Sequence, residues 1–426
     1  MAQGALPGFR DFYPEQFAER AYIMSVWRRI LRRYAFSEYD GPPLEPLDLY
    51  RKKSGDELVG QLYSFSDKGD REVAMRPEMT PTFARMVAAR ANALRKPVRW
   101  FSIPQLFRYE RQQKGRLREH FQLNADIVGE LSATADAELL AIALDIMREF
   151  GLSANDVKAR VSDRRLLQAL IVNAGAPEGS LSSVYAVIDK RGREPVEISR
   201  DKLEKAVGSA EVADAIDEFL AIDSITALSA KYGSLPAIAE HVERMSQYLG
   251  FLKALGVADW VQLDLSIVRG LAYYTGIVFE LFDTAGEFRA ICGGGRYDTL
   301  LQTLGGVDLP ALGFGMGDVV VGELLRKRGM IPETPARTDY WVAGEDESLT
   351  SQVMSVAAEL RKRDRSVEYS LKPQQLSRQL KSASAAGASH AVLLKHDRFS
   401  AGEITVKDLK SGSEQSVQLT EFINSL

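Results

Sequence analysis

Residues 107–126, reading FRYERQQKGRLREHFQLNAD, form the stretch of this chain best suited to chemistry. Between positions 108 and 118 five arginine or lysine side chains accompany a single acid, Glu110, and Gly115 marks a turn between two patterned arms. Arg108 and Glu110 lie two residues apart and would share one face of a strand, where a guanidinium can bind a phosphate and a carboxylate can accept from an amino group. The pattern predicts an anion-binding hairpin, with a solvated basic loop as the alternative.

Two other polar motifs accompany this stretch. In RPEMT (76–80) the residues Arg76, Glu78 and Thr80 alternate and could project to one side; Thr80 before a proline would also suit a helix cap. RGLAYYTG (269–276) joins two apolar arms and carries an arginine and two adjacent tyrosines. A tyrosine pair of this kind serves either in a binding site or in the core.

Composition limits the classes of protein that fit. A length of 426 residues suggests about two to three domains. The net charge of −4 argues against a wholly basic nucleic-acid coat, and a single cysteine, Cys292, excludes an intrachain disulfide framework. The four histidines lack metal-ligand spacing, so we expect no metal centre in the protein. Without a leader pattern or a long apolar run, we expect a cytoplasmic protein with no membrane contact.

The surrounding helices and strands can be predicted from the spacing of apolar residues and from the prolines and glycines that interrupt it. A helix starting at Pro14 has apolar residues at three- and four-residue spacing up to Tyr34, and a proline-rich segment that suits an edge strand follows it. Residues 62–75 predict a hairpin, 98–107 a strand, 134–150 a helix, and 157 the start of a further strand. Residues 166–257 are mostly helical, and the glycine runs ICGGG and GFGMG beyond them do not fit a dinucleotide-binding pattern.

Together these motifs resemble those of a known enzyme class. FRYE with the downstream Arg116 resembles motif 2 of the class II aminoacyl-tRNA synthetases, the first helix with Pro43 resembles motif 1, and GFGMG resembles motif 3. RGLAYYTG and RPEMT are similar to signatures of the histidyl-tRNA synthetase family. The resemblance implies an α+β fold: an antiparallel sheet flanked by helices, with a helical insertion and a C-terminal α/β domain.

The resemblance also implies domain limits and an assembly. The catalytic core would occupy 1–165 and 258–330, separated by the insertion at 166–257. After a linker at 331–337, residues 338–426 would form an anticodon-binding domain, whose arginines and lysines make one side basic. We also expect a homodimer, in which the first helix and the edge segment after it would form the subunit contact; packing of that helix on its own domain is the alternative.

The roles implied by the resemblance can be assigned to positions of this sequence. Histidine would be bound by Glu78, Met79, Thr80, Arg108, Gln122, Asp126, Arg269, Tyr273, Tyr274 and Tyr297. ATP would be bound by Arg108, Glu110, Arg116, His120, Phe121 and Arg269, with Mg²⁺ on its phosphates. Arg108 and Arg269 would be catalytic, acting on the α-phosphate during attack by the histidine carboxylate. Gln113 and Arg118 would contact the acceptor end of tRNA(His).

Three departures from the family pattern affect these expectations. Ala272 replaces an acidic residue within the tyrosine signature. Val319 and Val320 replace the glutamate and arginine that usually close motif 3, which removes a cation from the ATP site. His120 and Phe121 stand in the reverse of the usual order, so either ring could stack on adenine.

Two functions compete with histidine–tRNA ligation. The first is a histidine-binding regulatory paralogue of ATP phosphoribosyltransferase, which does not aminoacylate and would tolerate the missing arginine of motif 3. That paralogue usually lacks the C-terminal domain, and this chain retains Arg108, Arg116 and Arg269. The second is a nucleic-acid-binding protein without catalysis, which the paired phosphate-binding arginines disfavour.

Overall fold

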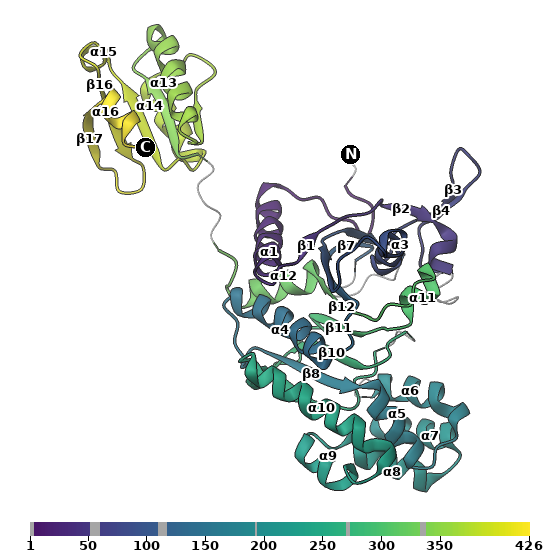
Figure 1. Cartoon of the computed structure of the whole chain (residues 1–426). Helices are drawn as coiled ribbons and strands as arrows, with labels where there is room; N and C mark the ends of the chain where they lie inside the picture. Colours follow the sequence, from purple (N-terminus) through teal and green to yellow (C-terminus); the bar gives the residue numbers. More distant parts are fainter. Residues whose placement is uncertain (1–3, 52–59, 110–116, 192–193, 270–272, 333–337) are drawn as a thin grey trace. The chain divides into compact units, whose positions relative to one another are not determined.

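The computed structural model describes residues 4–51, 60–109, 117–191, 194–269, 273–332 and 338–426. Glu110, Gln113, Arg116 and Ala272 therefore lie outside the described residues. The chain divides into two compact units, Met1–Ile331 and Pro332–Leu426, and each is described by itself (Figure 1). In the part of the chain that the structure describes, no helix is long and apolar enough to cross a membrane.

A large sheet organises the first unit, with nine strands in the described residues. The order is β1-β5-β7-β12-β11-β10-β8-β9, and β6 pairs with β7. The strands are β1 (Ser37–Glu38), β5 (Val98–Ser102), β6 (Gln105–Phe107), β7 (Glu119–Val128), β8 (Val157–Asp163), β9 (Val261–Leu263), β10 (Ile277–Asp283), β11 (Cys292–Arg296) and β12 (Ala311–Gly317). Only the outermost pairs, β1–β5 and β8–β9, are parallel in this sheet. An antiparallel sheet can bury one face and leave the other free for a ligand.

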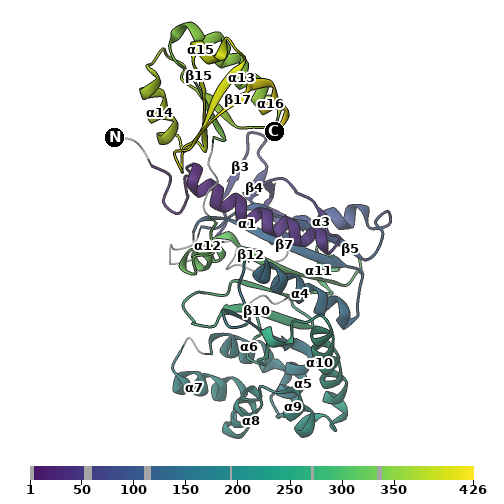
Figure 2. The same cartoon turned by 90° about the vertical axis from the view of Figure 1, so that its left-hand side faces the viewer.

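Helices cover one face of this sheet. These are α1 (Pro14–Arg33), α4 (Ala133–Glu149) and α12 (Asp318–Lys327), and Figure 2 is turned so that α1 lies in front. The buried residues of α1, from Ile23 to Leu31, follow the three- and four-residue spacing read in the sequence. On β7, Leu123 and Ala125 pack into the same core. Since strand side chains alternate, the even-numbered residues of β7 face the other side.

The predicted hairpin at 62–75 is present as β3 (Ser64–Ser66) and β4 (Glu72–Met75), with β2 (Leu44–Pro46) on the outer side of β4. The proline-rich segment supplies two edge strands, β1 of the large sheet and β2 of the small one, as predicted. The predicted single strand at 98–107 is instead interrupted between β5 and β6. Pro104 stands in this gap and has no N–H to donate to a ladder.

The helical insertion consists of α5 (Arg164–Asn173), α6 (Leu181–Lys190), α7 (Val196–Val207), α8 (Ala210–Leu220), α9 (Ile225–Tyr232) and α10 (Pro236–Ala254). It is drawn in teal in Figure 1. Asp163 begins α5 because its side chain accepts from the N–H groups of Arg165 (2.7 Å) and Leu166 (3.3 Å). The two apolar arms around RGLAYYTG are β9 and β10, which do not pair with each other but flank β8. Two short helices, α3 (Thr80–Arg90) and α11 (Leu300–Gly305), pack together near the sheet.

The second unit is a separate α/β structure. Its sheet has the order β14-β13-β15-β16-β17, from β13 (Tyr340–Gly344), β14 (Val367–Tyr369), β15 (His390–Leu394), β16 (Glu403–Asp408) and β17 (Glu414–Gln418). The helices are α13 (Thr350–Lys362), α14 (Leu376–Ala385), α15 (His396–Phe399) and α16 (Leu419–Asn424). The parallel pairing of β14, β13 and β15, with α13 and α14 between them in sequence, confirms the expected C-terminal α/β domain. Two residues of the predicted basic side hold the unit together instead: Arg361 donates to Val367 O and Arg365 to Leu426 O.

Candidate active site

A pocket opens on the face of the large sheet opposite α1, α4 and α12, where α3 and α11 cover only a part of the strands. It encloses about 480 Å³ of space, its open mouth included. Its lining comes from two parts of the chain that the insertion separates. The lining residues are Glu78, Thr80, Arg108, Gln122, Asn124, Asp126, Arg269, Tyr273, Tyr274, Gly293, Tyr297, Gly313, Phe314 and Gly315.

The RPEMT segment divides between the pocket and the core. Glu78 and Thr80 line the pocket, whereas Arg76 turns away: its Nη1 donates to Asp40 Oδ1 and to Gly41 O, both at 2.7 Å. The prediction that the three alternating residues share one side was wrong for Arg76, because the chain turns between β4 and α3 and the strand period ends there. The structure does not bring the Met79 side chain into the pocket either; it is fully buried beside Arg76.

The predicted helix cap at Thr80 is also wrong. The residue that precedes α3 is Met79, it already has helical backbone angles, and no side chain caps the helix there. Thr80 is instead the first residue of α3. Thr80 lines the pocket, and a threonine can donate to or accept from a ligand there.

An acid and three tyrosines form the inner end of the pocket. The Tyr297 hydroxyl donates to Asp126 Oδ1. The Tyr273 ring lies 4.8 Å from that of Tyr274 and 5.6 Å from that of Tyr297, measured between centroids. Burial, reinforced by the Asp126 carboxylate, raises the pKa of Tyr297 well above its ordinary value, and burial does the same for Tyr273. Both phenols therefore remain neutral and able to donate at physiological pH.

Arg269 is held in an unusual conformation. Its φ of 59° lies in the left-handed region, which residues with a side chain seldom adopt. Its Nη1 forms an ion pair with Glu280 Oε1, and its Cζ lies 5.8 Å from the centre of the Tyr274 ring. Burial alone would lower the pKa of Arg269, but Tyr274 and Glu280 outweigh it and raise that pKa. Arg269 is thus a fixed, permanently charged cation at the pocket.

Glycines form the floor beneath these side chains. Gly293 on β11 lies directly under the Arg269 guanidinium, so that a Cβ there would collide with it. On β12, a Cβ at Gly313 would collide with Asp126 and Tyr297, and one at Gly315 would come within 2.9 Å of the Gln122 amide. Glycines in a strand commonly let it pass under a ligand or a facing element; these also make room for the site's own side chains.

Arg108 enters the pocket from the central hairpin. Its Nε donates to Pro77 O at 2.9 Å, and its backbone N–H donates to Arg118 O at 2.9 Å. Arg118 is not among the lining residues; its guanidinium lies 4.2 Å from the centre of the Tyr109 ring. Arg108 and Arg269 therefore meet at one pocket, although they lie on opposite sides of the insertion in the sequence.

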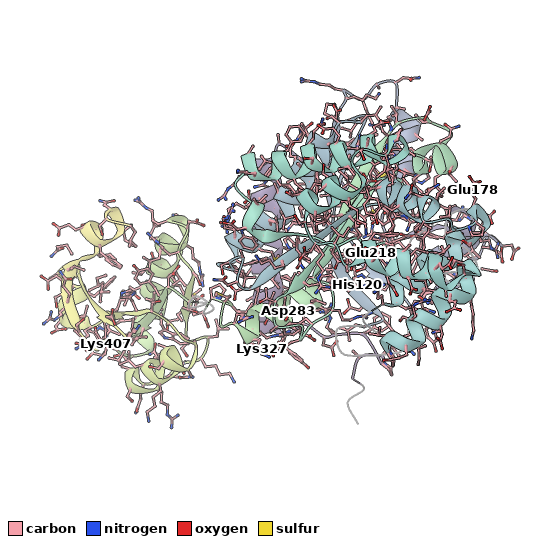
Figure 3. The ribbon with its side chains drawn as sticks, turned by 90° about the horizontal axis from the view of Figure 1, so that it is seen from below. His120, Glu178, Glu218, Asp283, Lys327 and Lys407 are labelled. Carbon is pink, nitrogen blue, oxygen red and sulfur yellow. The ribbon has the colours of Figure 1, made fainter. Side chains whose placement is uncertain are left out.

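The register of β7 separates His120 from Phe121. His120 shares strand parity with Gln122, Asn124 and Asp126, whereas Phe121 projects to the helix-covered side, where its ring is 6.1 Å from that of Phe12. Figure 3 labels His120 on its strand. Burial, followed by the charges of Arg108 and Arg10, lowers the pKa of His120 to about 3. Of the two candidate adenine-stacking rings, the structure brings only that of His120 to the pocket side.

Cations from the N-terminal segment surround the start of α12. Arg10 donates to Glu119 Oε1 at 2.6 Å and pairs with Asp318 Oδ2 at 3.0 Å. The Arg20 guanidinium lies 4.4 Å from the centre of the Phe121 ring and forms no ion pair with the described residues. Val320, where the motif 3 arginine was expected, is buried in the core.

Sequence reasoning missed Asn124, Phe314, Glu280 and the N-terminal cations. Asn124 lies between Gln122 and Asp126 at the strand period, and this alternation was sufficient to identify it. Glu280 is the single acid in the apolar run IVFELF, which was a usable indication of a buried partner. Arg10 carries no local indication, because its carboxylate partners lie more than a hundred residues away; Arg20 also stacks on the nearby Phe12 and Phe17, an arrangement that the spacing alone did not single out.

Comparisons with known proteins agree with this geometry. A family model described as histidyl-tRNA synthetase matches residues 8–317, and one described as an anticodon binding domain matches residues 337–426. The histidine–tRNA ligase of Opitutus terrae is 42% identical over 97% of this chain and 95% of that protein. The chloroplastic/mitochondrial histidine–tRNA ligase of Arabidopsis thaliana is 39% identical over 97% of this chain and 85% of that protein.

Solved structures give the same result. The histidyl-tRNA synthetase from Nostoc superposes with a TM-score of 0.84 at 25% identity and covers 100% of this chain and 99% of that one. The predicted α+β fold with an antiparallel sheet, a helical insertion and a C-terminal α/β unit is thus confirmed. This chain belongs to the histidyl-tRNA synthetase family.

Proposed function

We propose that the chain activates L-histidine with ATP to form histidyl-adenylate and then transfers histidine to the 3′ end of tRNA(His). One observation carries the proposal: Arg108 and Arg269 line the same pocket as the Asp126–Tyr297 pair. Two cations suit a reaction at phosphate, and a buried acid beside phenols suits an imidazole. Membership of the family supports this pairing of substrates.

Histidine recognition would use the acceptors and donors of the inner pocket. Glu78, Thr80 and Gln122 lie at the lining and would accept from the α-ammonium group, which needs acceptors. Asp126 would accept from one imidazole nitrogen, while a tyrosine hydroxyl, from Tyr274 or its neighbours, would serve the other. An amino acid without these ring nitrogens would leave buried polar groups unpaired, and this penalty supplies the specificity.

Adenylate formation would use the two arginines as electrostatic groups. The histidine carboxylate would attack the α-phosphorus, and Arg108 and Arg269 would stabilise the negative charge that develops on its oxygens. No covalent bond to the protein is required. His120 would stack on adenine, since it lies on the pocket side of β7 and remains neutral. Glu110 would contact adenine and Arg116 would bind the γ-phosphate; both residues lie outside the described residues.

The cation expected from motif 3 would come from another part of the chain. Arg10 is engaged by two carboxylates, and Arg20 stacks on Phe121 on the helix-covered side of β7, away from the pocket. We propose that the phosphates are bound by the arginines that remain, Arg108 and Arg269 at the pocket together with Arg116. Magnesium would arrive with the ATP phosphates as part of the substrate. In the described residues no group of three or more His, Cys, Asp or Glu side chains could hold a metal ion.

Transfer to tRNA would require contacts with the acceptor end and with the anticodon. Gln113 and Arg118 would contact the acceptor end, and the second unit would bind the anticodon, as its match to an anticodon binding domain suggests. We further propose a cytoplasmic homodimer. The same proposal includes the division of the chain into domains. The catalytic core would comprise 1–165 and 258–330, the insertion 166–257, the linker 331–337 and the anticodon-binding domain 338–426.

The regulatory paralogue of ATP phosphoribosyltransferase is the less supported function. Such a protein needs a histidine site but no cations for phosphate chemistry. Here Arg269 is held at the pocket by Glu280, and the C-terminal unit is present. Both features exceed what histidine sensing requires.

Histidine-dependent exchange of pyrophosphate into ATP tests the proposal, because activation needs no tRNA. We expect the purified chain to catalyse exchange with histidine and not with other amino acids. Arg269→Ala should lower the exchange rate far more than it weakens histidine binding. Histidine binding without exchange in the wild-type chain would reject the ligase function and favour the regulatory one.

A further inference from the structure

Arg164, the first residue of α5, contacts both ends of the segment that carries Arg269, Tyr273 and Tyr274. Its backbone N–H donates to Gly276 O at 3.0 Å. Its Nη1 donates to Val268 O at 2.9 Å. One residue therefore bridges the positions immediately before and after the segment 269–275, which supplies a cation and two phenols to the pocket.

This bridge lies where the backbone is under strain. Arg269 has a φ of 59°, and a residue with a side chain keeps this conformation only when its surroundings impose it. Val268, the preceding residue, is buried, and its carbonyl oxygen is the atom that the Arg164 guanidinium binds. A charge-assisted hydrogen bond at this carbonyl fixes the peptide that leads into Arg269.

The same guanidinium also reaches the second helix of the insertion, α6. Its Cζ lies 4.0 Å from the centre of the Tyr185 ring on α6, a short cation–π contact. Burial lowers the pKa of Arg164, and Tyr185 and Asp189 oppose this shift; an arginine side chain nevertheless remains charged at physiological pH. The insertion thus contributes a ring that holds the guanidinium against the Val268 carbonyl.

We propose that Arg164 is a positioning residue for the activation reaction. It holds Val268 and Gly276, and thereby the nearby Arg269 and Tyr274, in place, and through Tyr185 it couples them to α6. This inference rests on the proposed function, since the segment matters only if Arg269 and the tyrosines bind the substrates. The competing explanation is that Arg164 only anchors α5 on the sheet.

Arg164→Met tests the proposal, because it removes the guanidinium and retains the backbone N–H that binds Gly276. Arg200→Met is the matched control: Arg200 is also in the insertion, its Nη2 donates to Ala210 O at 2.9 Å, and it pairs with Asp214. Losing one charge-assisted bond should lower kcat/KM for histidine in pyrophosphate exchange by about tenfold to a hundredfold in Arg164→Met. Arg200→Met should stay within about twofold of the wild type.

Two further variants separate positioning from anchoring. Arg164→Lys keeps a donor and a cation for the Tyr185 ring, so it should restore most of the lost kcat/KM. Tyr185→Leu should lower kcat/KM by about threefold, and combined with Arg164→Met it should add little, because both act through one contact. Equal kcat/KM losses in the Met and Lys variants, matched by equal falls in melting temperature, would show anchoring alone and overturn the proposal.

Calorimetric titration with L-histidine distinguishes failure of this inference from failure of the proposed function. If the wild type binds histidine without catalysing exchange, the ligase proposal fails, while weaker histidine binding by Arg164→Met than by Arg200→Met still supports positioning. If Arg164→Met matches Arg200→Met in both exchange and histidine binding, the positioning inference is refuted whatever the wild type catalyses.

Discussion

Substituting alanine for Gly293 should separate catalysis from stability in this protein. Gly293 belongs to β11, has no positive φ, and pairs directly with Glu280 across the sheet. A Cβ placed there would lie 2.6 Å from Cζ of Arg269, whereas carbon atoms in contact prefer about 3.5–4.0 Å. The guanidinium must therefore retreat by about 1 Å, because the strand cannot.

The retreat gives the expected size of the effect. A misplacement of about 1 Å in a catalytic group can cost about a hundredfold in rate, which corresponds to about 2.7 kcal/mol. The free energy of unfolding should change little or rise, since alanine in a strand interior is favoured over glycine by about 0.5–1 kcal/mol. The displaced atoms belong to the end of a flexible side chain, so the core is not disturbed.

Two measurements check this reasoning: kcat for histidine-dependent pyrophosphate exchange, and urea-induced unfolding. Gly250→Ala is the matched control, because a Cβ at this position of α10 meets nothing within 4 Å. The control should gain about 1 kcal/mol in stability and keep full activity. A kcat for Gly293→Ala within about threefold of the wild type would refute the reasoning, as would a loss of stability comparable with the loss of activation free energy.

Three other predictions follow from the site and the two units. Tyr297→Phe removes the donor to the buried Asp126 and should raise KM for histidine about tenfold or more with a smaller change in kcat; an unchanged KM in the exchange assay would contradict this. The pKa of His120 is about 3 in the folded protein, against an ordinary value of 6.5. Between these two pH values the unfolded chain binds a proton at His120 and the folded chain does not, so the free energy of unfolding falls as the pH drops from 6.5 towards 3. At pH 5 the wild type should lose about 2 kcal/mol of unfolding free energy in this way. His120→Phe has no such group, so between pH 8 and pH 5 its unfolding free energy, measured in urea, should fall by about 2 kcal/mol less than that of the wild type. An equal pH dependence of the two proteins would count against the burial of a neutral imidazole. Residues 1–331 alone should retain exchange, because every lining residue of the pocket lies between 78 and 315, but should not aminoacylate tRNA; full charging by this fragment would exclude a role for the second unit.

Features that depend on local periodicity were the most predictable from sequence. The apolar spacing of α1 and the strand-turn-strand pattern at 62–75 both match the structure. The two arms of the central hairpin pair as β6 and β7, whereas its turn lies outside the described residues; the alternation within β7 brings Gln122 and Asp126 to one side, as expected for a strand. The same alternation assigns His120 and Phe121 to opposite faces of β7, so residue spacing is sufficient to separate these two rings.

Prediction was poorer where the chain changes direction or joins distant segments. Arg76 was grouped with Glu78 by strand alternation, but β4 ends at Met75 and the period no longer applies. The pairing of Arg10 with Glu119 and Asp318 joins three segments without any shared local pattern. Such contacts are set by tertiary packing, which residue spacing does not encode. The fold class was recoverable because five motifs occur in the right order along the chain.

The order of strands in the large sheet has a consequence for synthesis on the ribosome. β7 ends at Val128, but its neighbour β12 begins only at Ala311, after the whole helical insertion. A nascent chain that stops short of Ala311 therefore presents one unpaired edge of β7, and an unpaired edge can associate with other chains. The insertion, rich in local contacts, can fold meanwhile. The half of the pocket that β7 supplies therefore stays exposed until β12 has been synthesised and pairs with it.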